Sequence, residues 1–267
     1  MLHNMRSILL ATLLAAVVPA CTVDITGDVG PGGTGGTGGT GGTGGTGGDN
    51  GGGDNGSGTG AADNGKVAVT VDQTAVNTEL GKTIALTYTV ASMGGYAGTV
   101  TVTPTITNAA SAAVTGWTLT PSQSSVSLTD DSMATVTMNV MIPTDAMELM
   151  PIIKLDVNDG SSTAEVSSNF TIAKKVTINL APVGSGTHTD WPAKNAPLKI
   201  RAGTTVTFHN SDTIPHEIHS GGGIPHEGGP LNPGSDYTTT NVTDDATWYC
   251  HIHGTDSALS RLVSVEP

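Results

Sequence analysis

Three residues in the C-terminal part of the chain carry donor atoms suited to a transition metal. Cys250 and His253 lie in the run from Trp248 to Gly254, and His216 follows Pro215 further upstream. Together they offer one thiolate and two imidazoles, delivered by two expected strand ends. This donor set suits a mononuclear copper ion that transfers one electron at a time.

The N-terminus reads as an export signal. An apolar run from 8 to 18 follows Arg6 and ends in Val18-Pro19-Ala20-Cys21. The run is too short to span a bilayer as a stable helix. Residues 1–21 resemble a bacterial lipoprotein signal, which implies that Cys21 becomes the lipidated first residue. Thr22 after it favours the outer membrane. An ordinary secretory signal cleaved near Cys21 is the alternative. Either signal implies a periplasmic or cell-surface protein.

Cysteine usage and charge narrow the function classes. The chain has two cysteines. If Cys21 is lipidated, Cys250 cannot form an intramolecular disulfide, and metal ligation would account for a cysteine kept in an exported protein. The net charge is −13 with only 10 Lys and Arg residues. This composition excludes a basic patch for nucleic acid or for an anionic membrane surface.

Composition and periodicity divide the rest of the chain into three parts, and none has helical periodicity. Residues 22–65 are rich in Gly and Thr, which predicts a flexible linker. Residues 66–173 alternate apolar and polar side chains in short runs such as Ile84–Val90, Val136–Val140 and Ile153–Val157. These runs predict an immunoglobulin-like β-sandwich without a Cys-Trp-Cys framework. Residues 174–267 show the same alternation and contain seven of the eight histidines.

The order of motifs in 174–267 resembles the cupredoxin family, the blue copper proteins such as plastocyanin. The matching segments are Gly203–Asn210, Pro215-His216, Tyr249-Cys250, His253 and the final apolar run Leu262–Val265. The resemblance implies a Greek-key β-sandwich or barrel. It also implies one type 1 copper bound by His216, Cys250 and His253.

The chain departs from the family at the axial ligand. Members usually place a methionine a few residues after the second histidine, but no methionine follows Met150 here. The axial position falls on Leu259 or Ala258, depending on the alignment, and neither side chain coordinates a metal. We therefore expect a three-coordinate copper, with the Pro215 carbonyl at long distance and a raised reduction potential.

The remaining histidines have less specific interpretations. Strand alternation turns His251 away from a metal bound by Cys250. Tyr249 stands where multicopper oxidases have the first histidine of a His-Cys-His triplet, so that link to a coupled copper cluster is missing. His188 and His209 are expected at the surface. His219 and His226 are either exposed or form a second copper or zinc site.

These features predict an exported, membrane-tethered electron-transfer protein that is not an enzyme. Its partner would be a cytochrome or an oxidoreductase that docks on an apolar rim around His253. The rim is expected to consist of Ile214, Pro215, Ile224 and Ile252. The alternatives are copper storage or delivery, a surface-binding lipoprotein whose sandwich domain holds the function, and a fragment of a copper oxidase or nitrite reductase.

Overall fold

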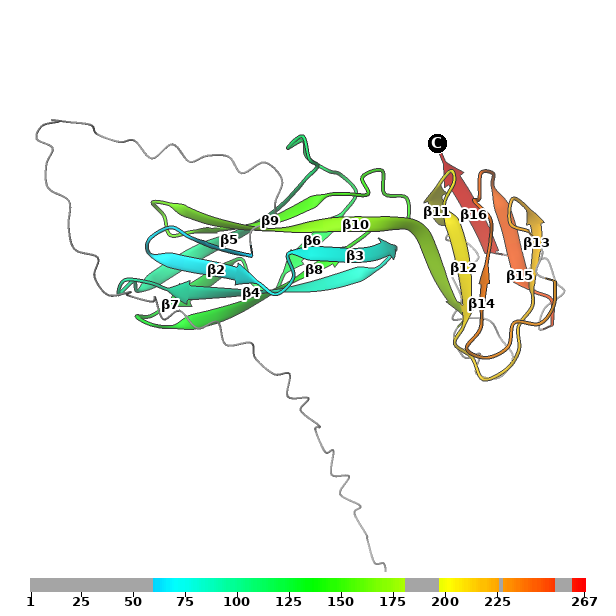
Figure 1. Ribbon diagram of the computed structural model, residues 1–267, viewed down its shortest axis with the longest axis horizontal. Helices are drawn as coiled ribbons and strands as arrows, with labels where there is room; N and C mark the ends of the chain where they lie inside the picture. The colour runs from blue at the N-terminus through cyan, green and yellow to red at the C-terminus, as the bar shows by residue number, and fades with distance from the viewer. Residues whose placement is uncertain (1–59, 181–196, 226–227, 253–260) are drawn as a thin grey trace, which may run out of the picture. The chain divides into compact units, whose positions relative to one another are not determined.

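In the computed structural model, every regular element of the described residues is a β-strand, as Figure 1 shows. The structure describes residues 60–180, 197–225, 228–252 and 261–267. The predicted all-β class is therefore confirmed. The described residues contain no apolar helix of membrane-spanning length. The predicted signal at 1–21 and nearly all of the linker at 22–65 lie outside these ranges.

The first domain packs a five-stranded sheet, in the order β1-β2-β4-β8-β6, against a second sheet that contains β7, β5, β9 and β10, with β3 paired to β10. The apolar faces of the predicted alternating runs meet between the sheets, where Leu86, Val136 and Leu155 are fully buried. The strands are β1 (Ala61–Asp63), β2 (Val67–Val71), β3 (Ala75–Leu80), β4 (Thr83–Ser92), β5 (Gly98–Thr107), β6 (Thr118–Pro121), β7 (Ser125–Leu128), β8 (Met133–Met141), β9 (Ile152–Asn158) and β10 (Thr163–Leu180).

Strand β10 continues through the predicted domain boundary between Ala173 and Lys174. Its first part pairs with β9 and β3, and its last part, Lys175–Leu180, pairs in parallel with β12. The pairing with β3 shifts register between Ala173 and Val176. The buried alternation is interrupted at the same place, because Lys174 is exposed. A single strand thus runs across the boundary predicted between 66–173 and 174–267, and the division into these two domains stays a prediction.

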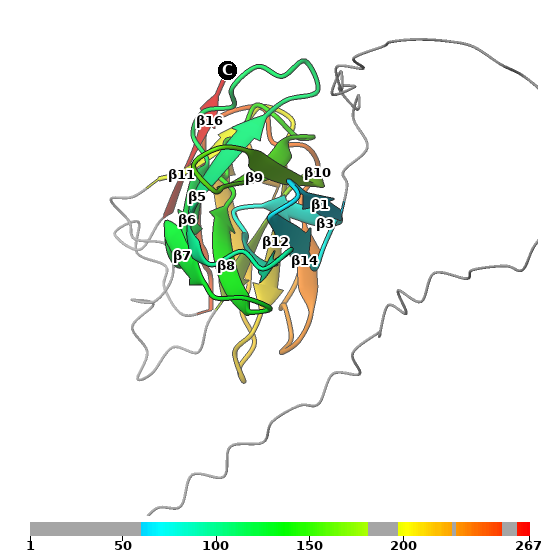
Figure 2. The same ribbon diagram turned by 90° about the vertical axis from the view of Figure 1, so that its left-hand side faces the viewer.

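The second domain has two layers of strands. In one sheet β12 pairs with β10, and β14 pairs with the other side of β12. The second sheet has the strand order β11-β16-β15-β13. Figure 1 shows β12 beside the last part of β10, and Figure 2 gives a view turned by 90° in which β12 and β14 are labelled next to each other. The bounds are β11 (Leu198–Arg201), β12 (Thr205–Asn210), β13 (Ile218–Gly222), β14 (Asp236–Thr238), β15 (Ala246–Cys250) and β16 (Arg261–Glu266).

An aromatic contact joins the two layers. The ring of Phe208 on β12 meets that of Trp248 on β15 edge-on, with centroids 4.8 Å apart, and both side chains are buried. Gly203 lies in the turn between β11 and β12, with a φ of 85° that favours glycine. The assignment to cupredoxins stays a prediction.

Candidate metal centre

A buried asparagine holds the loop that carries His216. Asn210 ends β12, is fully buried, and donates its side-chain amide to the carbonyls of Ile214 at 2.9 Å and Leu231 at 2.8 Å. The Leu231 carbonyl also accepts the backbone N–H of His216 at 3.0 Å. The backbone that leads to the histidine is therefore held at Ile214 by Asn210 and at His216 by Leu231.

The register of β13 and β15 places His216 and Cys250 on one face. Ile218 lies directly opposite Cys250, and the His251 N–H extends this ladder by donating to the Glu217 carbonyl at 2.8 Å. His216 precedes Ile218 by two residues, so strand alternation puts it on the same face as Cys250. Burial agrees, since His216 is 0 % and Cys250 2 % exposed. His216 itself lies two residues before β13, where it forms an isolated bridge with Leu231.

The rest of the predicted copper set cannot be placed. His253 and both axial candidates, Ala258 and Leu259, lie outside the described residues. Pro215 is exposed at the surface beside His216, and its carbonyl as a distant ligand stays a prediction. Within the described ranges no three His, Cys, Asp or Glu side chains are arranged to hold a metal. The predicted centre needs His253 to complete it.

The environment of the two placed ligands fits copper better than a hard cation. Neighbouring positions of the same face are apolar, with Ile218 0 % and Trp248 1 % exposed. A thiolate and an imidazole are soft or borderline donors that select copper or zinc, whereas Mg²⁺ and Ca²⁺ require oxygen ligands. A buried, water-poor face also protects a thiolate from oxidation. The donor set and its surroundings are thus consistent with the predicted copper.

One residue beside the predicted ligands was missed by the sequence reasoning. The carboxylate of Asp212 lies with Oδ2 3.2 Å from His216 Nε2, and the two side chains are 5 % and 0 % exposed. The other oxygen, Oδ1, accepts the Thr213 N–H at 2.6 Å. The run Asn210-Ser211-Asp212 is typical of a turn, in which such side chains cap nearby backbone groups. The turn signal was available in the sequence, but the contact with His216 was not.

The outer face of the same ladder carries a cluster of rings. His251 is exposed, as strand alternation predicted, and its Nδ1 lies 3.8 Å from Glu217 Oε1. The ring of His219 packs 4.8 Å from that of Tyr249 and 4.9 Å from that of His251. The alternative second metal site at His219 and His226 remains a prediction because His226 lies outside the described residues.

Two further surface histidines had been predicted. His209 is 38 % exposed in its side chain and forms an ion pair with Asp236, with Nδ1 and Oδ1 2.7 Å apart. It therefore lies at the surface of β12, as expected. His188 lies outside the described residues.

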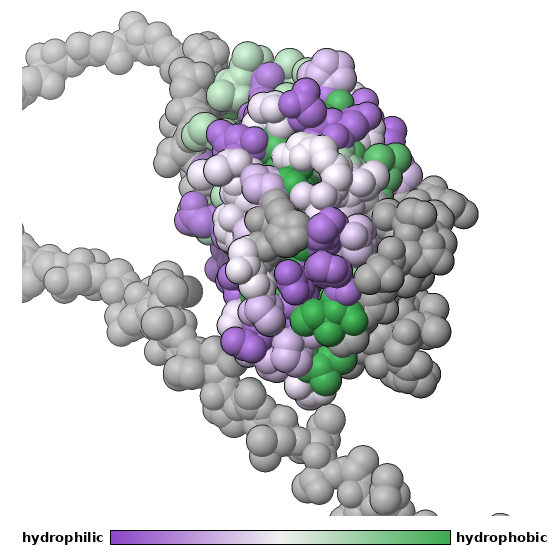
Figure 3. Space-filling view, turned by 90° about the vertical axis from the view of Figure 1, so that its right-hand side faces the viewer, coloured by the Kyte–Doolittle hydropathy of each residue, from purple (hydrophilic) through white to green (hydrophobic). Residues whose placement is uncertain are grey.

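The expected apolar rim is smaller than predicted. Ile214 and Ile252 are 39 % and 47 % exposed, and Pro215, next to the buried His216 in the sequence, is also exposed. Ile224 was wrongly included, because it is only 1 % exposed and belongs to the core. Figure 3 shows apolar side chains gathered in a small area of a face that is otherwise mostly polar.

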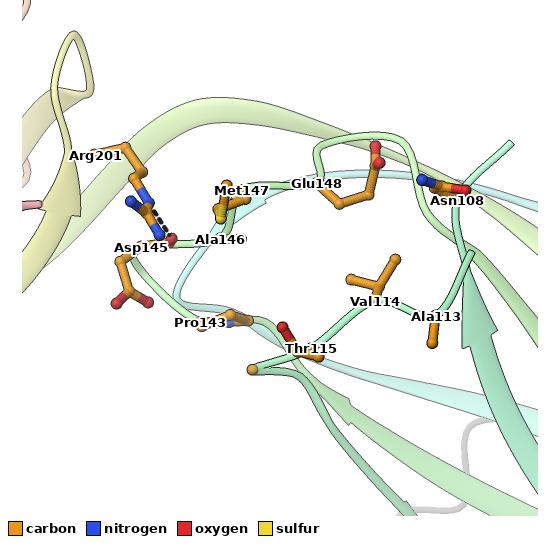
Figure 4. A pocket seen from close by; sticks show the side chains of 11 residues that line it. Asn108, Ala113, Val114, Thr115, Pro143, Asp145, Ala146, Met147, Glu148 and Arg201 are labelled. Atoms are coloured by element: carbon orange, nitrogen blue, oxygen red, sulfur yellow. Dashed lines mark hydrogen bonds between the residues drawn. The ribbon is translucent and has the colours of Figure 1, made fainter. Parts of the chain in front are cut away.

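A separate pocket of about 490 Å³ lies away from these residues. Figure 4 shows that Asn108, Asp145, Glu148 and Arg201 line it, and that Arg201 Nε donates to the Asp145 carbonyl at 2.9 Å. Its lining includes no histidine, cysteine or serine that would act as a nucleophile or a soft metal ligand. His216 and Cys250 therefore remain the candidate site.

Comparisons with known proteins find only distant structural likenesses. No family model and no curated protein matches the chain. A FixG-related protein from Vibrio parahaemolyticus is 14 % identical with a TM-score of 0.30, over 40 % of this chain and 94 % of that one. The Salmonella enterica SafA pilin in complex with the SafB chaperone is 11 % identical with a TM-score of 0.28, over 74 % and 96 %. The E. coli chaperone DraB is 12 % identical with a TM-score of 0.28, over 74 % and 98 %. Likenesses this weak support no inference about function.

Proposed function

We propose that this protein is an exported type 1 copper protein of the cupredoxin kind that transfers single electrons. The observation that carries the proposal is the placement of His216 and Cys250 on one buried face, at the ends of two paired elements. A buried imidazole and a buried thiol supply two of the three donors that a type 1 copper site needs. His253, three residues after Cys250, supplies the third donor of the proposed set.

The chain's own residues have three tasks in this proposal. A bound copper would supply the change between Cu(I) and Cu(II). His216 keeps its position because Asn210 and Leu231 hold its loop. The β13–β15 ladder holds Cys250, so the donor atoms shift little when an electron arrives or leaves. The apolar side chains of Ile218 and Trp248 exclude water from the donors.

Electron exchange requires a surface close to the centre where a partner can dock. Ile214, Pro215 and Ile252 supply exposed apolar groups near the two donors. A redox protein such as a cytochrome or an oxidoreductase is the proposed partner. The net charge of −13 favours a partner with a basic docking face.

The N-terminal part completes the proposal. Lipidation at Cys21 would anchor the protein to a membrane, with the outer membrane favoured, and residues 22–65 would act as a flexible tether. Replacement of Cys21 by serine is then expected to move the protein from the membrane fraction to the soluble fraction. The chain is proposed to carry electrons and to catalyse no reaction of its own.

Titration of the mature protein with Cu(II) tests the copper site. An intense absorption band near roughly 600 nm is expected from the bond between thiolate and Cu(II). Cys250→Ser should abolish the band, while the matched control His209→Ala, which removes an exposed histidine of the same domain, should leave it unchanged. Absence of the band in the wild type, or its survival in Cys250→Ser, would refute the proposal.

Electron transfer and copper storage differ in their kinetics. An electron carrier loaded with Cu(II) should be reduced rapidly by a ferrous c-type cytochrome in anaerobic stopped-flow experiments. A storage or delivery protein should instead release copper readily to a chelator and exchange electrons slowly. The second result would replace the electron-transfer role with the alternative one while keeping the metal site.

A further inference from the structure

The buried carboxylate of Asp212 has no part in the copper site described so far. Its side chain is 5 % exposed, and burying a carboxylate is costly unless charged or hydrogen-bonding groups compensate it. Oδ1 accepts the Thr213 N–H at 2.6 Å, and Oδ2 lies 3.2 Å from His216 Nε2. The carboxylate therefore has one oxygen on its own turn and the other on a proposed copper ligand.

The contact between Asp212 and His216 determines which ring nitrogen of the histidine carries the hydrogen. An ionised carboxylate only accepts hydrogen bonds, so the contact requires His216 Nε2 to carry the hydrogen. In the neutral ring Nδ1 then carries the lone pair that a metal needs. We propose that Asp212 is a positioning residue, which selects this tautomer of His216 and directs Nδ1 toward the copper.

The same contact affects the metal's redox equilibrium. Partial withdrawal of the Nε2 proton by the carboxylate makes the imidazole a stronger donor, and a nearby negative charge favours the more positive ion. Both effects stabilise Cu(II) relative to Cu(I), so Asp212 lowers the reduction potential. This opposes the rise expected from the missing axial methionine. The redox part of the inference rests on the proposed copper function, whereas the tautomer part does not.

The surrounding turn gives the carboxylate a fixed position. Asn210 Oδ1 accepts the Asp212 N–H at 2.9 Å, and the amide of the same side chain holds the Ile214 carbonyl. Asp212 and Ile214, both in the turn that leads to His216, are thus tied to the same buried asparagine. A contact held in this way can select a ring orientation before any metal arrives.

Asp212→Asn is the main test variant, because it keeps the shape and an acceptor oxygen but removes the charge. Loss of such a group beside a metal ligand typically weakens metal binding 10–100-fold. If Cu(I) affinity is unchanged, the same factors correspond to a rise in reduction potential of about 60–120 mV. The matched control is Asp236→Asn, which removes the carboxylate from the exposed His209 pair in the same domain and should change neither quantity.

Three measurements separate the outcomes. Nitrogen NMR of the wild-type apoprotein reports the His216 tautomer without copper, and an Nδ1–H ring there would overturn the proposal. In the copper-loaded proteins, chelator competition and spectroelectrochemistry should show weaker Cu(II) binding and a higher potential for Asp212→Asn alone. A potential equal to that of Asp236→Asn would overturn the redox part.

Failure of the proposed function has a different signature. If wild-type protein shows no thiolate–copper band, the copper proposal fails, and the apoprotein tautomer alone decides the role of Asp212. If Asp212→Asn does not fold, Asp212→Ser, which also keeps an acceptor oxygen, provides the comparison. The wild-type tautomer measurement requires no variant.

Discussion

Replacement of Asn210 by alanine should destabilise the second domain and loosen the loop that carries His216. The side chain is fully buried and takes part in three hydrogen bonds, two as donor to Ile214 and Leu231 and one as acceptor from Asp212. A typical intramolecular hydrogen bond contributes about 0.5–1.5 kcal/mol net, and a buried group left unsatisfied costs about 1–3 kcal/mol. The Leu231 carbonyl keeps the His216 N–H as a donor, and Ile214 lies near solvent. We therefore expect a loss of about 2–4 kcal/mol in the free energy of unfolding.

Urea denaturation followed by tryptophan fluorescence measures this loss, since Trp248 lies in the core of the same domain. Amide hydrogen exchange at His216 adds a local measurement, and its protection should fall in the variant. The matched control is Asn241→Ala, because Asn241 is exposed and its side chain accepts one long hydrogen bond from Thr205 at 3.3 Å. A loss below about 1 kcal/mol, or one equal to that of the control, would show that Asn210 does not hold the loop.

Two acidic residues of the first domain should give pH effects of opposite sign. Hydrogen bonds from the side chain and backbone of Ser161 and from Ser162 hold the pKa of Asp159 well below its ordinary value. Asp159→Asn should therefore be destabilising at pH 7, and the gap from wild type should shrink as pH falls below about 4. A gap that is independent of pH in urea unfolding would contradict this. Burial, with the charge of Glu165 directly across the ladder, raises the pKa of Asp156. The ionised form is thus disfavoured in the fold, so Asp156→Asn should gain about 0.2–1 kcal/mol at pH 7 and less near pH 4. Equal stability of variant and wild type at pH 7 would refute this.

Alternation predicted the strands well because most of them have one face in a core. Leu86, Tyr88 and Val90 in β4 are all fully buried, and the polar residues between them are at least partly exposed. The extent of β10 was not predicted, since it depends on pairing with partners far along the chain. Lys174 interrupts its buried face and resembles a domain boundary, although the backbone continues as one strand.

The roles of His216 and Cys250 as ligands stay a prediction, and the groups that hold them in place were only partly predictable from the sequence. His216 and Cys250 follow from residue type and strand parity. The error at Ile224 has a different cause, because this residue follows the end of β13 and its burial in the core depends on the path of a glycine-rich turn. The contact between Asp212 and His216 depends on how a turn folds back, which periodicity does not describe.

The placement of the two ligands on one face depends on the register of β13 against β15. A slip of one residue would turn Cys250 to the outer face while His216 stayed inside. Two glycines at the far end of the ladder make the close pairing possible. Gly222 has a φ of 99°, and an added Cβ would lie 3.0 Å from the Asp245 carbonyl oxygen; at Gly223 it would lie 2.5 Å from that of Asp244. Any side chain there would push the strands apart, so the ladder that carries Cys250 depends on glycine at both positions.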